Sequence, residues 1–412
     1  MSLAIRTSLI ALSSVMMLSA CSTVSSLWSD QAETENVKSQ TTALMDSKHG
    51  NAPSNGSNAA TASGSIDLVW SNNVDQRKPA SPMGFSVPTA VQSSAGERII
   101  VGGQDYRVRI YNAQGNELNR IALNEACESA ALQMSNGLVI VGDLGGTIYA
   151  LDIDQAKVIW SVGLSAALIG SPIAYGDGFI IQTSNNQLYR FSHDGKKIWS
   201  YSDALGGLSM HLSPSPVVYK GRVFAALSNG DVVALNADTG SFIWKRQLLL
   251  SNKASVMSEL KVPVAMPLLI TAKQSGRDED VLLVPVFQGQ LSFLSMLDGS
   301  TLSNRNISSK SSPLLVGNQV FVADTSGALS ALNALDGETT WKQQLSDGEL
   351  TGPVLWQGSL WVADDQATVY RLSQTGKLLA SKDLDGRIDR SPVVGKNGIL
   401  VRNNLGSIYM LR

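Results

Sequence analysis

A short apolar segment recurs eight times between residue 106 and residue 411. Successive copies end 38 to 44 residues apart, except that the copy ending at Leu294 follows the one ending at Leu235 by 59 residues. The excess falls among polar residues between Ser251 and Asp280, which predicts inserted loops. Self-similarity at such a period indicates a fold built from one repeated supersecondary unit. The copies cover residues 106–111, 146–151, 186–191, 230–235, 289–294, 327–332, 367–372 and 406–411.

Each unit has the same internal order of short segments. A run of β-branched and aromatic residues precedes the recurring segment, as in Arg222-Val-Phe-Ala225. Several units begin with Pro after Ser or Gly, a place where a strand loses no ladder hydrogen bond. A Gly-containing turn follows the recurring segment, and then often a strand ending in Trp. Four short strands in about 40 residues are typical of a β-propeller blade, and the absence of helical periodicity excludes a solenoid of helix pairs.

The eighth unit stops at Arg412, directly after its third strand. A candidate for the missing strand lies at the other end of the repeats, because Ile66-Asp-Leu-Val-Trp-Ser71 matches the Trp-ending strand Phe242-Ile-Trp-Lys245. If this N-terminal strand completes the last blade, the ring closes without an unpaired edge at the seam. The sequence therefore predicts an all-β fold over residues 65–412: an eight-bladed β-propeller of four-stranded antiparallel blades, closed by the N-terminal strand.

The first 20 residues have the pattern of an export signal. One positive charge precedes the apolar stretch Leu9 to Leu18, which is too short to span a bilayer. Leu18-Ser-Ala-Cys21 resembles the bacterial lipobox, which implies acylation of Cys21 and stable anchoring by several acyl chains. Ser22 stands where lipoproteins of the inner membrane usually carry Asp. We therefore predict a signal peptide over residues 1–20 and sorting to the periplasmic face of the outer membrane.

Residues 21–64 are predicted to form a lipidated N-terminus and a flexible tether. Large apolar side chains are few here, and the segment from Asn51 to Gly64 is of low complexity, so it cannot form a core. A coil of this length has an end-to-end distance of roughly 35–40 Å. The folded part can therefore stand off the membrane.

Charge and motifs exclude several classes of function. Lys and Arg total 32 against 34 Asp and Glu, so there is no basic excess for nucleic acid. The three His and two Cys show no metal-ligand spacing, and no nucleophile elbow or phosphate loop occurs. We expect no cofactor, no metal and no catalytic residues. Cys127 is alone in the predicted mature chain, which favours a buried structural thiol.

The repeats also resemble a known family of propellers. Ala234-Leu-Asn-Ala-Asp-Thr-Gly-Ser-Phe-Ile-Trp244 is similar to the tryptophan-docking repeat of quinoprotein-type propellers, in which the Trp packs against the neighbouring blade. Together with the lipobox, the tether and a length near 400 residues, the pattern resembles the BamB family, the lipoprotein subunits of the outer-membrane β-barrel assembly machinery. The structural Trp residues predicted in this way are Trp70, Trp160, Trp199, Trp244 and Trp341.

The resemblance implies a non-enzymatic scaffold that binds a POTRA domain of the central BamA-type subunit. It implies help in folding and inserting outer-membrane β-barrel proteins, with unfolded barrel clients and, indirectly, the other lipoproteins of the machinery as further partners. The family's binding loops correspond to Ser202–Pro214 and Leu250–Pro267. The family's usual Arg falls on His211 and its acidic positions near Val262 and Val264, so its charge pair is not matched. The partner-binding residues implied are Leu208, Met210, His211, Val262 and Val264.

Two other functions fit a propeller of this type. A quinoprotein dehydrogenase would use pyrroloquinoline quinone and Ca²⁺, but such enzymes are longer and often carry a vicinal disulfide. A periplasmic protein that binds sugar or peptide in the channel is the second alternative. For the scaffold, we expect a rigid ring that orients POTRA domains, with strand edges open to unfolded clients by β-augmentation.

Overall fold

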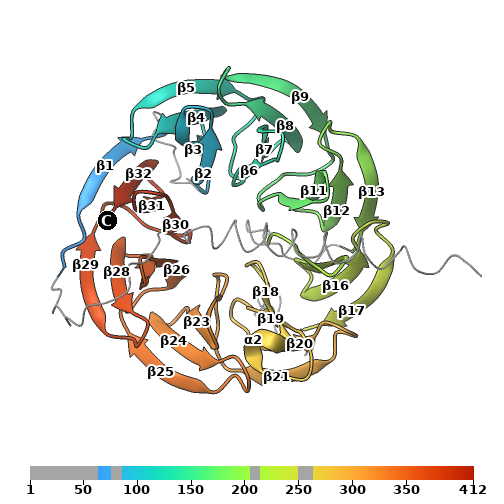
Figure 1. Ribbon diagram of the computed structural model, residues 1–412, viewed down its shortest axis with the longest axis vertical. Coiled ribbons are helices and arrows are strands. Elements are labelled where there is room, and N and C mark those ends of the chain that lie inside the picture. The colour runs from blue at the N-terminus through green and yellow to red at the C-terminus, as the bar shows by residue number, and fades with distance from the viewer. Residues whose placement is uncertain (1–63, 76–85, 205–213, 249–262) are drawn as a thin grey trace, which may run out of the picture.

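The computed structural model describes residues 64–75, 86–204, 214–248 and 263–412, which form a closed ring of eight sheets (Figure 1). Each sheet has four antiparallel strands, and we number them as blades 1 to 8 along the chain. Blade 8 joins β30, β31 and β32 from the C-terminal end with β1 from the N-terminal side. The predicted eight-bladed propeller, closed by its N-terminal strand, is therefore confirmed.

The strands are short, from two residues in β6 to seven in β3. Blades 1 to 4 contain β2 (Thr89–Ser93), β3 (Gly96–Gly102), β4 (Arg107–Asn112), β5 (Glu117–Ala122), β6 (Leu132–Gln133), β7 (Val139–Gly142), β8 (Thr147–Asp152), β9 (Lys157–Gly163), β10 (Ile173–Tyr175), β11 (Gly178–Gln182), β12 (Gln187–Phe191), β13 (Lys197–Ser202), β14 (Val217–Tyr219), β15 (Arg222–Ala226), β16 (Asp231–Asn236) and β17 (Phe242–Gln247).

Blades 5 to 8 contain β18 (Leu268–Ile270), α2 (Ala272–Ser275), β19 (Val281–Val284), β20 (Leu291–Ser295), β21 (Thr301–Arg305), β22 (Leu314–Val316), β23 (Gln319–Ala323), β24 (Ala328–Asn333), β25 (Thr339–Gln344), β26 (Leu350–Trp356), β27 (Ser359–Asp364), β28 (Thr368–Ser373), β29 (Leu378–Asp383), β30 (Val393–Val394), β31 (Ile399–Arg402), β32 (Ser407–Leu411) and β1 (Leu68–Asn73).

The hydrophobic core is divided among the junctions between blades. The second and third strands of a blade, such as β15 and β16, are buried along nearly their whole length because a neighbouring blade covers each face. The outer strand β17 is mostly exposed. One cluster of buried apolar side chains fills each of the eight junctions. Each junction is therefore a separate contact, which its own residues must stabilise.

A Trp on the outer strand spans five of these junctions. Its indole N–H donates to a backbone carbonyl in the hairpin between the third and fourth strands of the next blade, as from Trp199 to Ala237 at 2.9 Å. The ring lies against a glycine of that hairpin, such as Gly240, whose φ is 71°. The five Trp residues are Trp70, Trp160, Trp199, Trp244 and Trp341, and their acceptors are the carbonyls of Ala113, His193, Ala237, Met296 and Gln374.

A buried ion pair lies where the ring closes. Arg402 on β31 donates to the carboxylate of Asp75, just after β1, at 2.6 Å. The side chains are 1% and 2% exposed. A second guanidinium N–H donates to the carbonyl of Gly102 in blade 1 at 2.7 Å. Arg402 thus joins blade 8, the N-terminal strand and blade 1.

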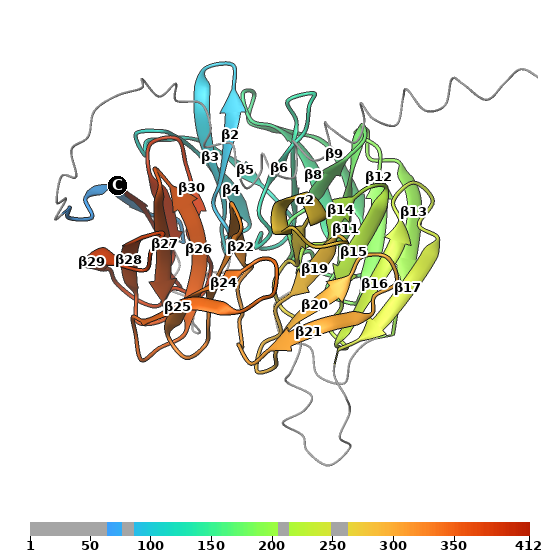
Figure 2. The same cartoon turned by 60° about the horizontal axis from the view of Figure 1, so that its bottom comes forward.

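The two faces of the ring carry different connections. The turn between the first and second strands lies on one face, where the β2–β3 hairpin projects in the side view of Figure 2. The connections between blades lie on the opposite face, with the turns between second and third strands. The described ends of both predicted binding loops therefore lie on the connection face.

The fifth unit contains a single turn of helix where the sequence predicts loops. The helix α2 has a capping box between Thr271 and Gln274 and ends at Gly276, whose φ is 74°. One turn is too short to give a helical period in the sequence, although both caps are visible there. Within the described ranges, no helix is long and apolar enough to cross a bilayer.

Candidate functional site

Most of the residues predicted to bind a partner lie outside the described ranges. Val264 is described, and its side chain is buried, with 5% exposed. The structure shows the chain at both ends of each predicted binding loop, which we call the loop's root. The predicted residues outside the described ranges are Leu208, Met210, His211, Val262 and the lipidation residue Cys21.

The connection from blade 3 to blade 4 leaves β13 through a polar cluster. Its central group is the carboxylate of Asp203, which is only 7% exposed. This carboxylate accepts hydrogen bonds from the hydroxyl of Tyr201 at 2.7 Å and from the amide of Ala204 at 2.7 Å. The ammonium of Lys245 on β17 lies 3.2 and 3.3 Å from its two oxygens. We call this cluster the 3/4 root; its members are Asn186, Tyr201, Asp203, Asn229, Asp231 and Lys245.

The carbonyl of Ala204 is held from two sides. The side-chain amides of Asn186 and Asn229 donate to it at 2.9 and 3.2 Å. The amide oxygen of Asn186 accepts from the backbone of Ser228 in blade 4 at 2.9 Å. Asn186 is 1% exposed and has a φ of 60°, which is unusual for a residue with a side chain. Its side chain therefore ties blade 3, blade 4 and the start of the connection together.

Electrostatics favour the charged state of this root. Burial by itself would raise the pKa of Asp203, but the hydrogen bonds from Tyr201, from the Ala204 amide and from Lys245 outweigh it and lower the pKa. For Lys245, burial opposes the charge, while Asp203 and Asp231 favour it, and the pKa is raised. Burial and the neighbouring carboxylate raise the pKa of Tyr201, so its hydroxyl remains a donor. The 3/4 root therefore combines the ion pair of Asp203 and Lys245 with the hydroxyl donor of Tyr201. This arrangement holds the backbone amide of Ala204 in place.

The connection from blade 4 to blade 5 has an apolar root instead. Leu248, which follows β17, packs with Met266 and Leu269 in the cluster between these blades. Val264 and Ala265, which precede Met266 in the chain, are also buried. This connection is therefore held by packing, and the 3/4 root by directed polar contacts.

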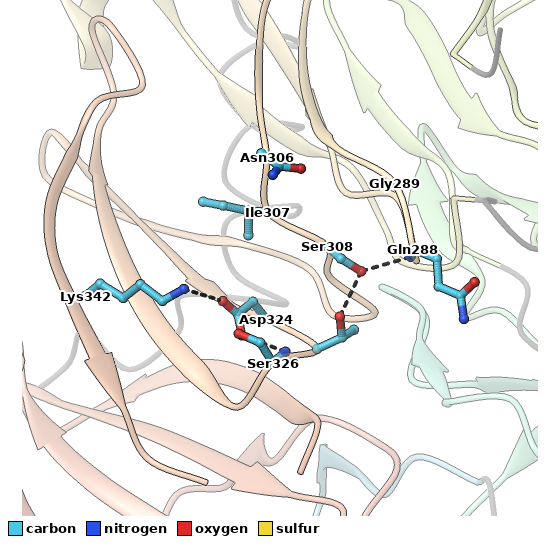
Figure 3. Close-up of a pocket in the computed structure, with 9 residues that line it drawn as sticks. Gln288, Gly289, Asn306, Ile307, Ser308, Asp324, Ser326 and Lys342 are labelled. Atoms are coloured by element: carbon cyan, nitrogen blue, oxygen red, sulfur yellow. Dashed lines mark hydrogen bonds and ion pairs between the residues drawn. The ribbon is translucent and has the colours of Figure 1, made fainter. Parts of the chain in front are cut away.

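A polar hollow of about 360 Å³ lies on the same face between blades 5 and 6 (Figure 3). The hydroxyl of Ser308 accepts from the backbone of Gln288 at 2.8 Å and from Thr325 at 2.9 Å. Lys342 points at Asp324, with 3.3 Å between nitrogen and oxygen. The remaining lining residues are Gly289, Asn306, Ile307 and Ser326. Its hydroxyls, amides and charges suit hydrogen bonding to a polar protein surface.

Groups with potential chemistry are occupied by structural contacts. In the polar insert of blade 5, Glu279 accepts from Ser295, and Asp280 accepts from the backbone of Ala272 and from Lys220. Across the described ranges, no group of three or more His, Cys, Asp or Glu side chains is placed to hold a metal ion. Burial raises the pKa of the Cys127 thiol to about 12, so the reactive thiolate is scarce at neutral pH.

The sequence predicts Asp203 only as part of a binding loop, and it predicts Asn186 and Lys245 as ordinary parts of the repeat rather than as site residues. Both lie in strands or turns of the repeat, at positions that look like ordinary propeller sequence. A signal is present for Asp203, because the other repeats carry an apolar residue at its position. Asn186 carries no such signal, since Tyr106 and Ala367 also replace glycine at its position.

Comparisons with known proteins agree with this architecture. The family described as outer membrane protein assembly factor BamB matches residues 104–343 and 325–411. A relative of that description from Yersinia pestis is 24% identical over 290 residues, which is 69% of this chain and 72% of the relative.

Solved structures share the ring. The crystal structure of BamB from Moraxella catarrhalis superposes with a TM-score of 0.70 at 18% identity, over 84% of this chain and 99% of that one. Quinohemoprotein alcohol dehydrogenase from Comamonas testosteroni gives a TM-score of 0.62 at 13% identity, over 84% of this chain and 76% of the enzyme. At these identities the likeness shows the fold alone. The family match over most of the propeller is more specific, and by it this chain belongs to the BamB family of outer membrane protein assembly factors.

Proposed function

We propose that this chain is a non-enzymatic, lipid-anchored scaffold for the assembly of outer-membrane β-barrel proteins. The single observation that carries the proposal is the family match across the propeller, from residue 104 to residue 411. The export signal and lipobox at residues 1–21 support anchoring through Cys21 at the periplasmic face of the outer membrane. Residues 22–64 then act as the tether and residues 65–412 as the folded scaffold.

The partner is a POTRA domain of the central BamA-type subunit. The surface proposed is the connection face over blades 3 to 5, where the two binding loops of the family fall at 202–214 and 250–267. Leu208, Met210 and His211 supply contacts from the first loop, and Val262 and Val264 mark the second. The polar hollow between blades 5 and 6 lies on the same face and extends this surface by one junction.

A matched pair of double variants tests this surface. Leu208→Asp with Met210→Asp places two charges in the proposed contact, where a buried unpaired charge is costly. We expect at least a tenfold loss in recovery of the BamA-type subunit when the full-length chain is pulled down from solubilised outer membranes.

The control places the same charges on the opposite face. Leu297 and Leu335 lie in outer hairpins and are 70% and 47% exposed. Leu297→Asp with Leu335→Asp should leave recovery of the subunit unchanged. Equal recovery with both double variants would show that the connection face is not the binding surface.

A further inference from the structure

The residue that follows the outer strand occupies an equivalent place in every blade. In seven blades its backbone amide donates to the carbonyl of the residue before the third strand, at distances from 2.7 to 3.3 Å. Ile307 holds the eighth place by strand register, two residues after Arg305, which pairs with Leu291. The seven donors are Val74, Leu123, Leu164, Asp203, Leu248, Leu345 and Leu384, and the acceptors are Gly406, Tyr106, Gly146, Asn186, Gly230, Gly327 and Ala367.

Seven of these eight residues are apolar, and Asp203 is the exception. Each apolar one packs into the cluster of the junction that its connection crosses. The cluster between blades 3 and 4 has no such residue from the connection. A leucine here would add to junction packing, as in the other blades, whereas a buried carboxylate must be compensated by partners. Packing therefore does not explain the aspartate.

The acceptor at this place is one of three that are not glycine, together with Tyr106 and Ala367. Four of the seven acceptors are glycines, which suit the left-handed backbone of the turn. Asn186 adopts the same backbone with a φ of 60°, and its buried side chain makes two hydrogen bonds, one with the carbonyl of Ala204 and one with the backbone of Ser228 in blade 4. Asn186 is therefore distinguished by its two side-chain hydrogen bonds, to Ala204 and Ser228, and not by its backbone. Asp203 and Asn186 both bind the backbone of Ala204, the carboxylate at its amide and the asparagine at its carbonyl.

We propose that Asp203 and Asn186 are positioning residues that fix the direction in which the 3/4 connection leaves the ring, so that it meets a folded protein partner. The Asp203 carboxylate accepts from the amide of Ala204, and the Asn186 side chain donates to the carbonyl of Ala204. The peptide units before and after Ala204 are therefore both held. Lys245 anchors the carboxylate to blade 4. The inference rests on the proposed function, in which this connection contacts a POTRA domain. Preorganisation lowers the ordering cost of binding without adding any contact.

The decisive variant is Asp203→Leu, which restores the residue type of the other blades. Lys245 keeps Asp231 at 3.3 Å, so no charge is stranded. We expect the midpoint of thermal unfolding to stay the same or rise, while affinity for a purified POTRA fragment of the BamA-type subunit falls about tenfold. Binding is measured by calorimetry on the full-length chain in detergent. Asp177→Leu, at a 70% exposed carboxylate on the opposite face, should change neither quantity.

The isosteric variant Asp203→Asn guards against misfolding of the leucine variant. It weakens the contact with Lys245 and should lower affinity to a smaller extent. Hydrogen exchange of peptides covering residues 200–204 reports the root directly and should accelerate in both variants. Normal binding by a folded leucine variant would overturn the positioning role and leave the proposed function intact. If the leucine variant lost stability in proportion to its loss of affinity for the POTRA fragment, Asp203 would be only a structural residue. If the wild-type chain did not bind the fragment, both proposals would be refuted.

Discussion

At the scale of single residues, each docked Trp depends on the absence of a side chain opposite it. Gly240 has a φ of 71°, and a Cβ built on it would lie 2.7 Å from the ring of Trp199. Gly221 has nearly the same backbone, with a φ of 68°, but a Cβ there would meet nothing within 4 Å. Comparing alanine variants of the two glycines therefore separates the free-energy cost of a left-handed backbone from the cost of a Cβ that collides with the indole.

We predict that Gly240→Ala destabilises the ring by about 2–4 kcal/mol, because it combines left-handed strain with overpacking of the indole. Gly221→Ala, with the strain alone, should cost about 1–2 kcal/mol. Unfolding in urea, followed by Trp fluorescence, measures both. Equal costs would mean that the indole moves aside freely and that the glycine serves the backbone only.

At the scale of elements, three junctions lack a docked Trp, and they show which features of the hairpin the Trp requires. Between blades 1 and 2 the corresponding outer-strand residue is Asn119, and the hairpin residue opposite is Ala156, with a φ of 53°. Glycine is not needed there, since no indole abuts the turn. Between blades 7 and 8 the residue is Ala380, and the last blade has no hairpin to receive a Trp, because its third and fourth strands come from opposite ends of the chain.

Blade 5 uses an arginine instead. Arg305 donates from Nε to the carbonyl of Gly337 at 2.7 Å and pairs with Glu338 at 2.8 Å, while the ring of Phe293 faces Gly337. We predict that Arg305→Lys costs about 1–2 kcal/mol, because an ammonium cannot reproduce the fork of bonds. Urea unfolding measures this cost. Arg120→Lys, at a side chain that is 45% exposed and pairs with Glu117, should cost about 0–0.5 kcal/mol and provides the control.

These junctions mark the limit of prediction from sequence. The repeat, the number of blades and the Trp phase follow from local spacing, since a turn glycine and a Trp four residues on lie in one hairpin, as Gly240 and Trp244 do. The substitute Arg305 stands two residues past the expected Trp position and has different chemistry, so no motif finds it. Asn186 and Lys245 meet Asp203 only after folding brings two blades together. Long-range polar partners of this kind leave no periodic signal.

At the scale of the whole molecule, the stability of the ring depends on the contacts that close it between blade 8 and blade 1. Asp75 and Arg402 are both nearly inaccessible to solvent, so removal of one leaves the other charge buried without its partner. We predict that Asp75→Ala destabilises the protein by about 3–5 kcal/mol, measured by urea unfolding. The double variant Asp75→Leu with Arg402→Met should recover most of this loss, because neither charge remains. Failure of the double variant to recover would show that the seam depends on the backbone contacts of these side chains, from Arg402 to Gly102 and from Gln104 to Asp75.

The placement of β1 also determines when the protein can be finished. A ribosome makes this strand before any other in the propeller, yet its hydrogen-bonding partner β32 is made last. Until β32 has been made, the first strand has no place to pair and the circle stays open. A truncated product that ends before residue 407 would keep both unpaired edges. Such edges are open to pairing with other chains and to proteases, so pairing of β1 with β32 protects the ring from both.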